Sequence, residues 1–254
     1  MRGYRLAGKR ALITGGGSGI GRAIAVRLGQ EGAGLAVADI RAESAEATAT
    51  RIREAGGASL ALTTDVSDAA QASALIERTV AEFGGLDILV NNAGIELAGD
   101  LAQTAEADFD RVMAVNLKGT YLVSRAALPH LLSSRGVILN IGSELGLIGY
   151  PPMTIYAASK AAVISLTKST ARRYAAEGLR VNCLCPGGTD TPLLQRLIAA
   201  APDPEAERRA AVEFVPMHRL GRPEEIAAVA AFLVSDEASF ITGAILAADG
   251  GTVA

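Results

Sequence analysis

Short apolar segments alternate with amphipathic segments along nearly the whole chain, and this alternation restricts the fold more than any other feature. The apolar segments are rich in Val, Ile, Leu and Ala, which is typical of buried strands, whereas the segments between them carry apolar residues at helical spacing. Strands joined by helical crossovers run parallel, and a sheet this apolar needs cover on both faces. The sequence therefore predicts an α/β fold, a doubly wound, seven-stranded parallel sheet with helices on both faces.

Strands and helices are expected to alternate without exception. The expected strands are Arg10–Thr14, Leu35–Asp39, Ser59–Thr64, Leu86–Asn91, Val137–Ile141, Arg180–Leu184 and Ala244–Ala247. The expected helices are Ile20–Gln30, Ser44–Glu54, Ala69–Phe83, Ala105–Ser133, Ile155–Glu177 and Pro223–Val234. Because parallel strands bind ligands at their carboxyl ends, functional residues are expected to follow the ends of strands.

The 254 residues are expected to form a single domain, residues 1–254, because α/β domains of this length are common and half of the residues are apolar. The one long irregular region runs from Pro186 to about Met217 and contains several prolines. Long irregular segments inside compact domains are usually functional, so we interpret residues 187–217 as a substrate lid. A mobile surface loop without function is the alternative.

The charge balance argues against binding to nucleic acid or to a membrane surface. The chain has 24 basic and 27 acidic residues, a net charge of −3 and no cluster of Lys and Arg. No apolar stretch is long enough to cross a bilayer, and no secretory signal pattern is present. We expect a cytoplasmic protein whose partner is a small molecule.

The histidines and cysteines do not show the spacing of a metal site, and no metal cofactor is expected. His130 and His218 lie far apart in the sequence. Cys183 and Cys185, two residues apart on an expected strand, point the same way and are too close for easy disulfide geometry. We interpret them as small core residues, with a metal pair or a reactive thiol as alternatives.

A glycine-rich turn at residues 14–21, TGGGSGIG, links the first expected strand to the first helix. Gly15 permits a sharp exit from the strand, Gly19 lets the backbone approach a pyrophosphate, and Gly21 allows close packing of the helix on the strand. The start of the helix offers free N–H groups and positive potential to phosphate. The spacing differs from the common dinucleotide fingerprint, and no Gly-Lys-Ser/Thr follows, which disfavours a nucleoside-triphosphate loop.

An acidic residue, Asp39, ends the second expected strand. At this place a carboxylate accepts hydrogen bonds from an adenosine ribose and repels the additional phosphate of NADP, so NAD is the preferred cofactor. Ser18 stands where a basic residue would favour NADP, although Arg41 offers a group that could bind its phosphate. A helix cap or turn residue is the alternative interpretation of Asp39.

The segment from Tyr156 to Lys160 begins an expected helix, and a separation of four residues puts the phenol and the ammonium on one face. A tyrosine with a pKa of about 10 needs a neighbouring cation to act as a base near neutral pH, and we expect Lys160 to lower the pKa of Tyr156. Ser143 follows the strand Val137–Ile141 and is the candidate that holds a substrate oxygen. Taken alone, Tyr-x-x-x-Lys is a common pattern, and structural packing is the alternative.

These motifs, in this order, resemble those of the short-chain dehydrogenase/reductase family, in its short single-domain branch, over nearly the whole chain. The resemblance implies a Rossmann-like fold and an NAD(H)-dependent oxidoreductase that interconverts a secondary alcohol and a ketone by hydride transfer. It also implies a catalytic set in which Tyr156 is the general acid/base and Ser143 orients the substrate oxygen. In that set Lys160 also holds the nicotinamide ribose, and Asn116 holds a water near it in a proton relay.

By resemblance, Asp65-Val66 contacts the adenine ring, Asn91–Gly94 supports the sheet beside the nicotinamide ribose, and Pro186-Gly187 packs on the nicotinamide. Together with the glycine turn, the expected cofactor-binding residues are Gly15, Gly17, Ser18, Gly19, Ile20, Gly21, Asp39, Ile40, Asp65, Val66, Asn92, Ala93, Gly94, Tyr156, Lys160, Pro186, Gly187, Thr189 and Thr191.

The substrate is set by loops that the family does not share, chiefly Ile95–Ala98, Glu144–Tyr150 and the lid. Glu96, Glu144 and Tyr150 are the candidate substrate-binding residues. Carboxylates accept hydroxyl hydrogen bonds strongly, so we hypothesise a polyol, sugar or hydroxy acid; a solvated or structurally paired acid is the alternative. A 3-oxoacyl thioester is the other candidate substrate, and it would dock on basic residues near the lid. These are Arg196, Arg208, Arg209, His218, Arg219 and Arg222.

A non-catalytic, cofactor-binding regulator on the same fold is the alternative from a different class. The intact set of Ser143, Tyr156 and Lys160 argues against it, since a protein without catalysis would be free to lose them. The segments Ala105–Ser133 and Ile155–Glu177 are rich in Ala and Leu, and the family commonly pairs the matching helices between subunits. We expect a homotetramer, although apolar helix faces can equally be intramolecular core.

Overall fold

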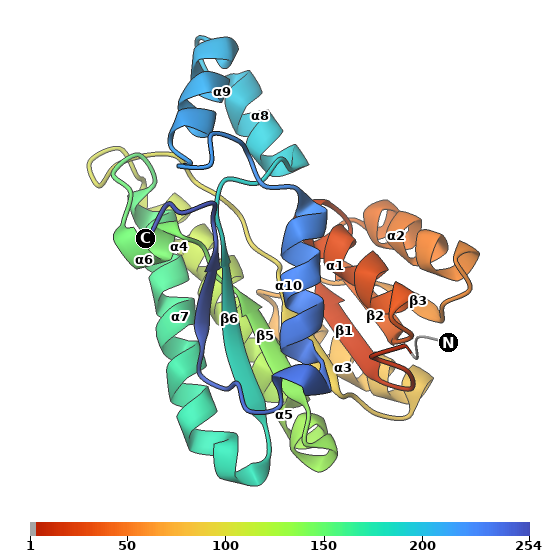
Figure 1. The fold of residues 1–254 in the computed structure, drawn as a ribbon. Coiled ribbons are helices and arrows are strands. Elements are labelled where there is room, and N and C mark those ends of the chain that lie inside the picture. The colour runs from red at the N-terminus through yellow and green to blue at the C-terminus, as the bar shows by residue number, and fades with distance from the viewer. Residues whose placement is uncertain (1–3) are drawn as a thin grey trace.

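The structure, a computed structural model, describes residues 4–254 and contains one seven-stranded parallel sheet (Figure 1). The strand order is β3-β2-β1-β4-β5-β6-β7, so the direction of winding reverses between β1 and β4. This arrangement confirms the predicted doubly wound fold, and the reversal places a crevice for ligands at the carboxyl ends of the central strands. Residues 1–3 of the expected domain lie outside the described residues.

Every expected strand is present, with small differences at the ends. The strands are β1 (Arg10–Thr14), β2 (Gly34–Asp39), β3 (Ser59–Thr63), β4 (Ile88–Asn91), β5 (Val137–Ile141), β6 (Arg180–Pro186) and β7 (Ile245–Ala248). The α-helices are α1 (Gly19–Gln30), α2 (Ala42–Glu54), α3 (Ala69–Phe83), α4 (Glu106–Met113), α5 (Thr120–Ser134), α6 (Leu145–Ile148), α7 (Thr154–Tyr174), α8 (Pro192–Ala200), α9 (Pro204–Glu213) and α10 (Pro223–Val234).

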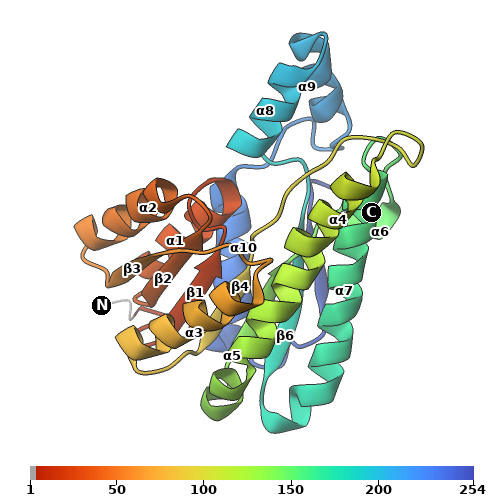
Figure 2. The ribbon, with the colours of Figure 1, turned by 180° about the vertical axis from the view of Figure 1, so that it is seen from behind.

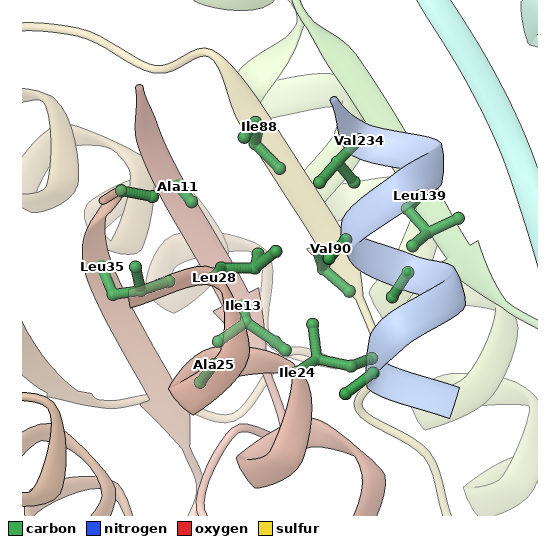
Figure 3. Packing of buried hydrophobic residues seen from close by; sticks show 14 of the residues in the cluster. Ala11, Ile13, Ile24, Ala25, Leu28, Leu35, Ile88, Val90, Leu139 and Val234 are labelled. Atoms are coloured by element: carbon green, nitrogen blue, oxygen red, sulfur yellow. The ribbon is translucent and has the colours of Figure 1, made fainter. Parts of the chain in front are cut away.

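The two faces of the sheet are covered by different helices. One face carries α1, α2 and α10, and the opposite face carries α3, α4, α5 and α7 (Figures 1 and 2). Leu28 and Ile24, four residues apart on α1, pack with Ile13, Val90 and Leu139 from three neighbouring strands (Figure 3). Alternate residues of each strand enter the two cores, which fixes the strand register and hence the common edge at which the strands end.

The expected helix Ala105–Ser133 is present as an unbroken helical segment over residues 106–134, but the segment is not α-helical throughout. The structure divides it into α4, a π-helical turn over Ala114–Gly119 and α5. The side chain of Asn116 in this turn accepts a hydrogen bond from the Ile95 N–H at 2.8 Å and donates one to the Ile95 carbonyl at 3.0 Å. Because these contacts come from another part of the chain, helical periodicity does not reveal the widened turn, which is a feature often found at functional sites.

The expected irregular region also contains regular structure. Helices α8 and α9 lie within residues 187–217, beyond the end of the sheet to which β6 leads (Figures 1 and 2). Each begins with proline, after a residue, Thr191 or Asp203, whose side chain accepts a backbone hydrogen bond from the first turn. Proline suits the first turn of a helix because the N–H that it lacks has no partner there. Two of the prolines that indicated irregular chain, Pro192 and Pro204, therefore mark helix starts.

The structure also bears on the cysteines, on metal binding and on membrane-spanning helices. Cys183 and Cys185 are free thiols, fully buried on β6 with their Sγ atoms 3.8 Å apart. Between residues 4 and 254, no group of three or more His, Cys, Asp and Glu side chains is arranged to hold a metal ion. No helix in the same part of the chain has both the length and the apolar character to cross a membrane.

Candidate active site at the carboxyl ends of the strands

The asparagine that follows β4 stabilises the glycine turn. The Asn92 side-chain amide donates hydrogen bonds to the carbonyls of Thr14 and Gly15, at 3.1 and 3.0 Å. Gly15 has a φ of 63°, and a side chain at Gly21 would lie 2.2 Å from the Gly15 carbonyl oxygen. Only glycine fits these two positions, so the first strand, the turn and the start of α1 have one mutual arrangement.

Thr14 has a structural role that was not predicted from the sequence. Its hydroxyl oxygen accepts hydrogen bonds from the N–H groups of Asn92 and Ala93, both at 3.1 Å. These bonds tie the ends of β1 and β4 together at the point where the winding of the sheet reverses. The signal in the sequence was a hydroxyl residue at the end of an otherwise apolar strand.

The buried carboxylate of Asp39 also shapes the turn. Its oxygens accept hydrogen bonds from the N–H groups of Gly17 and Arg41, each at 3.0 Å, and a side chain at Gly17 would lie 2.6 Å from the carboxylate. The Arg41 guanidinium lies 3.7 Å from the same carboxylate. Asp39 thus has the turn role considered as its alternative, and it stands at the edge of the glycine turn as a ribose-binding acid would.

The start of α1 suits a dinucleotide phosphate. Ser18 precedes the helix in an extended conformation, and no side chain caps the N–H groups of the first turn. Free N–H groups and the helix dipole at such a helix start attract an anion, and the glycines of the turn carry no side chains that would block its approach. Arg22, which the sequence argument did not single out, donates hydrogen bonds to the Gly17 carbonyl and to the Thr48 hydroxyl and so braces the turn.

The residues expected around the adenine lie at the ends of β2 and β3. Ile40 is largely exposed after β2, which leaves an apolar surface beside Asp39. Asp65 follows β3, and its side chain accepts hydrogen bonds from the N–H and the hydroxyl of Ser67 at 2.9 and 2.7 Å. Val66 is buried against Gly119 of the π-helical turn. The arrangement brings the adenine-side candidates to the same edge as the glycine turn.

Ser143 and Tyr156 face each other across the end of β5 and the start of α7. The Ser143 hydroxyl is hydrogen-bonded to the Tyr156 phenol, which by itself lowers the pKa of the phenol. Burial raises the pKa of Tyr156 most strongly, and the charge of Glu96 raises it further, so the net shift is upward. In the protein without its cofactor, the loss of hydration thus outweighs the hydrogen bond with Ser143, and the lowering of this pKa by Lys160 stays a prediction for the complex with NAD+.

Lys160 lies close to the Ser143–Tyr156 pair. Its Nζ donates a hydrogen bond to the Ile141 carbonyl at 2.9 Å and lies 5.7 Å from the centre of the Tyr156 ring. Burial lowers the pKa of this ammonium. A side chain at Gly94 would lie 3.3 Å from both the Lys160 Nζ and the Asn116 Oδ1, which shows how closely these two side chains approach the Asn-Asn-Ala-Gly element.

Ser159 is a second residue that the sequence argument missed. It accepts a hydrogen bond from the Asn116 amide at 2.9 Å, and its hydroxyl donates to the Tyr156 carbonyl at 2.7 Å. Asn116, 1% exposed, is therefore fixed to the helix that carries Tyr156 and Lys160. The serine lies inside the Tyr-x-x-x-Lys pattern, but its hydroxyl faces the π-helical turn, and only the fold shows that contact.

Glu96 places a carboxylate beside this centre. Its Oε2 atom is buried without a hydrogen-bond partner. Burial raises the pKa of Glu96, while the charges of Lys160 and Arg196 lower it. Arg196 belongs to α8, so Glu96 is influenced both by the candidate catalytic lysine and by the segment 187–217.

Glu144 and Tyr150 are the other two candidate substrate residues. Glu144 is 4% exposed, and the Thr252 hydroxyl and the Gly188 N–H are polar neighbours of its carboxyl group. Burial raises the pKa of Glu144 to about 7. The Tyr150 ring lies 5.4 Å from that of Phe214, centre to centre, and borders a cavity of about 430 Å³ between α6 and the start of α7. Neither Ser143 nor Tyr156 lines that cavity.

The segment after β6 returns to the glycine turn. The Gly187 N–H donates to the Ala248 carbonyl, and the Thr189 hydroxyl donates to the Gly187 carbonyl at 2.8 Å. A side chain at Gly19 would contact Thr191 at 3.4 Å. The residues expected at the nicotinamide therefore lie between the glycine turn and the Ser143–Tyr156 pair.

Comparisons with known proteins agree with this architecture. A family model described as enoyl-(acyl carrier protein) reductase matches residues 15–253. A cis-4-hydroxycyclohexanecarboxylate dehydrogenase of Sinomonas cyclohexanicum is 44% identical, with 99% of each chain covered. A 3-oxoacyl-[acyl-carrier-protein] reductase of Thermotoga maritima is 40% identical, covering 98% of this chain and 99% of the relative. The crystal structure of a dehydrogenase/reductase from Sinorhizobium meliloti superposes with a TM-score of 0.91 at 42% identity, over 99% of this chain and 98% of that one.

The chain belongs to the short-chain dehydrogenase/reductase family. It is an oxidoreductase that acts on CH–OH groups of a small-molecule substrate and binds a nicotinamide cofactor. The residues around the glycine turn fit that cofactor, since an uncapped helix start and an acid at the end of β2 match its phosphate and ribose.

Proposed function

We propose that this enzyme interconverts a secondary alcohol and a ketone with NAD(H), and that Tyr156 is its general acid/base. The observation that carries the proposal is the meeting of Ser143, Tyr156, Lys160 and Asn116 at the edge of the sheet where the glycine turn lies. A cofactor site alone would need none of these contacts. Their presence also argues against a regulator without catalytic activity.

Each of the four residues has a different role in the proposed reaction. When bound, the cofactor supplies or accepts the hydride. In reduction, Tyr156 donates its proton to the carbonyl oxygen of the substrate while Ser143 holds that oxygen, and in oxidation Tyr156 accepts the proton. The raised pKa of Tyr156 keeps the phenol protonated in the protein alone, which suits the donating direction. Lys160 holds the nicotinamide ribose, and Asn116 supports the proton relay from the π-helical turn.

NAD is proposed over NADP because the buried Asp39 carboxylate would face the additional phosphate of NADP. Its hydrogen bonds to the N–H groups of Gly17 and Arg41 keep the carboxylate at the edge of the turn. The Arg41 side chain, about half exposed, is the group that would favour NADP if it left the carboxylate.

For the substrate we propose a polyol, sugar or hydroxy acid. Glu96 supports this choice, because its buried Oε2 lacks a partner and a substrate hydroxyl would supply one. Glu96→Gln should lower kcat/KM for hydroxylated alcohols about tenfold relative to plain secondary alcohols, since it removes a charged acceptor. Equal loss for both substrate groups would refute this role of Glu96.

A 3-oxoacyl thioester is the second candidate substrate, and the relative from Thermotoga maritima favours it. The basic residues that would dock its phosphate-bearing carrier are partly engaged within the chain. Arg219 and Arg222 pair with Glu225, and Arg209 approaches Glu205 at 3.9 Å. This pairing supports the smaller substrate over the carrier-bound one.

Residues 187–217 are proposed as the lid of a single-domain enzyme, and the enzyme as a homotetramer that pairs helices α5 and α7 between subunits. Large apolar side chains are exposed on the helices of that face, among them Phe109 on α4 and Tyr121 on α5. Light scattering at micromolar concentration tests the assembly, and a monomer would contradict it.

The central experiment follows reduced nicotinamide by absorbance while the protein and NAD+ or NADP+ meet a panel of secondary alcohols, polyols, sugars and hydroxy acids. Tyr156→Phe should lower kcat by about 10³-fold, because it removes the proton that the reaction transfers. Binding of NADH to the variant, followed separately, should stay close to that of the wild type. Equal turnover by the wild type and Tyr156→Phe would overturn the assignment.

A further inference from the structure

Glu144 follows the candidate catalytic serine directly, yet its carboxyl group leaves that site. Its N–H donates a hydrogen bond to the Pro186 carbonyl at 3.1 Å, which continues the pairing of β5 with β6 beyond the strand ends. Its side chain then passes to Gly187, where an added side chain would lie 2.5 Å from the Glu144 Oε2. The carboxyl group thus lies against the first residues after β6, at the root of the segment 187–217.

The same carboxyl group reaches the turn after β7. The Thr252 hydroxyl and the Gly188 N–H are its polar neighbours and lower its pKa, while the Thr252 hydroxyl donates its own proton to the Asp249 carbonyl at 2.9 Å. The added side chain at Gly187 that would meet Glu144 would also lie 2.6 Å from the Asp249 Cα, so Glu144 and Asp249 both pack closely against Gly187. Three segments distant in the sequence therefore converge on one carboxyl group: the end of β5, the root of 187–217 and the C-terminal turn.

One oxygen of this group lacks a partner. The Glu144 Oε2 is buried and accepts no hydrogen bond, and a buried charged oxygen without a partner is costly. The Asp249 carboxylate accepts hydrogen bonds from the N–H groups of Gly251 and Val253, so it stays in place as a negative neighbour. A protonated Glu144 relieves both costs.

We propose that Glu144 is a positioning residue that fastens the root of segment 187–217 and the C-terminal turn to the strand end carrying Ser143. In its neutral form the carboxyl group holds these segments together. Ionisation places a buried negative charge beside Asp249 and loosens them. The proposal makes Glu144 a structural coupling between the root of the lid and the reaction centre, where the sequence had suggested a substrate ligand.

The charged groups around Glu144 determine whether the coupling strengthens or weakens as the pH rises. The groups that act on the Glu144 carboxyl are Asp249 on the C-terminal turn, Thr252 and the Gly188 N–H, and Tyr156 on α7 feels its charge in turn. Among residues 4–254, no cation contributes to the shift in the pKa of Glu144. Because the pKa of Glu144 is raised to about 7, the coupling is complete below that pH and is lost as the pH rises through it.

The test is hydrogen exchange of the NADH-bound full chain at pH 6 and pH 8, corrected for the intrinsic pH dependence of exchange. In the wild type, protection of peptides covering 187–191 and 249–253 should fall about threefold from pH 6 to pH 8. Glu144→Gln, which stays neutral, should keep similar protection at both pH values. Glu144→Ala should lose about tenfold of this protection at both values. Glu82→Gln, at an exposed carboxylate on α3, is the matched control and should behave as the wild type.

The proposal fails if Glu144→Ala keeps wild-type protection in both peptides, or if Glu144→Gln keeps the wild-type dependence on pH. Thr252→Val should reproduce part of the Glu144→Ala effect in the 249–253 peptide, and a wild-type result there would also count against the coupling. The inference rests on the proposed function only for its link to catalysis. The exchange measurement needs no turnover, so failure of the proposed reaction and failure of the coupling are seen separately.

Discussion

The glycine turn, residues 14–21, and the segment 187–217 lie at the same edge of the sheet but are held there in different ways. The turn is closed by hydrogen bonds that the Asn92 amide donates and the Asp39 carboxylate accepts, and its glycines leave almost no free space. Within 187–217, by contrast, the buried apolar side chains are Ile198 and Val215, and most of α8 and α9 is exposed. A densely bonded turn keeps its shape, whereas a segment with few buried contacts opens at low cost. The difference supports the proposal that the first region binds the cofactor rigidly and the second admits the substrate.

The largest expected effect comes from adding a methyl group to each region. Gly21→Ala should lower the free energy of unfolding by about 3 kcal/mol or more, because the new Cβ would lie 2.2 Å from a backbone oxygen. Gly188→Ala at the root of 187–217 meets only the ends of Leu220 and Val215, at 3.3 and 3.6 Å, and should cost under about 1 kcal/mol. Urea unfolding measures both. Similar losses for the two variants would remove the distinction between the regions.

A second prediction concerns cofactor choice, which should depend on the turn alone. Asp39→Asn removes the negative charge while keeping one acceptor for a backbone N–H, and it should shift the ratio of kcat/KM for NAD over NADP by about 30-fold toward NADP. Asp203→Asn, which changes the cap of α9, is the matched control and should leave the ratio unchanged. If the ratio stays the same in Asp39→Asn, then Arg41 and the rest of the turn determine the preference.

The two regions also differ in how far the sequence predicted them. The strands, the glycine turn and Asp39 were predictable because apolar runs, glycines and a charged strand end act through short-range contacts. The π-helical turn was not, because the hydrogen bonds that Asn116 exchanges with Ile95 involve another segment of the chain. The helices in 187–217 were missed because proline marks both irregular chain and helix starts, and the capping contacts of Thr191 and Asp203 distinguish the two.

Within the candidate site, sequence spacing identified the side chains but not the direction of their pKa shifts or their contacts. Tyr156 and Lys160 are on one helix as expected, yet burial decides the direction of the Tyr156 pKa shift, and burial depends on the whole fold. Glu96 and Glu144 were both predicted from the sequence to bind a substrate hydroxyl. In the structure both charges raise the pKa of Tyr156, but Glu144 packs against Gly187 and Glu96 is influenced by Lys160 and Arg196, a difference that no local pattern contains.

A smaller effect is expected where segment 187–217 meets the body of the enzyme. Phe214→Ala removes the ring that packs 5.4 Å from Tyr150. Aromatic pairs contribute about 0.5–1.5 kcal/mol beyond their buried area, so KM for the substrate should rise about threefold to tenfold. The affinity for NADH and the urea midpoint should change little, because the turn and the core do not include this pair. A large loss of NADH affinity would show that the two regions are not independent.

The smallest expected effect concerns Glu96, whose charge acts on Tyr156 and is influenced by Arg196 in segment 187–217. Its charge raises the pKa of Tyr156, so Glu96→Gln should move the rise of alcohol oxidation to lower pH, since oxidation needs the deprotonated phenol. Arg196 on α8 lowers the pKa of Glu96 and keeps it charged. Arg196→Gln should therefore raise the pKa of Glu96 and, wherever Glu96 becomes neutral, shift the oxidation profile in the same direction as Glu96→Gln. In the Glu96→Gln background, the additional change at Arg196 should have no further effect on the profile. An unchanged shift from Arg196 in that background would mean that α8 acts on Tyr156 by a route other than Glu96.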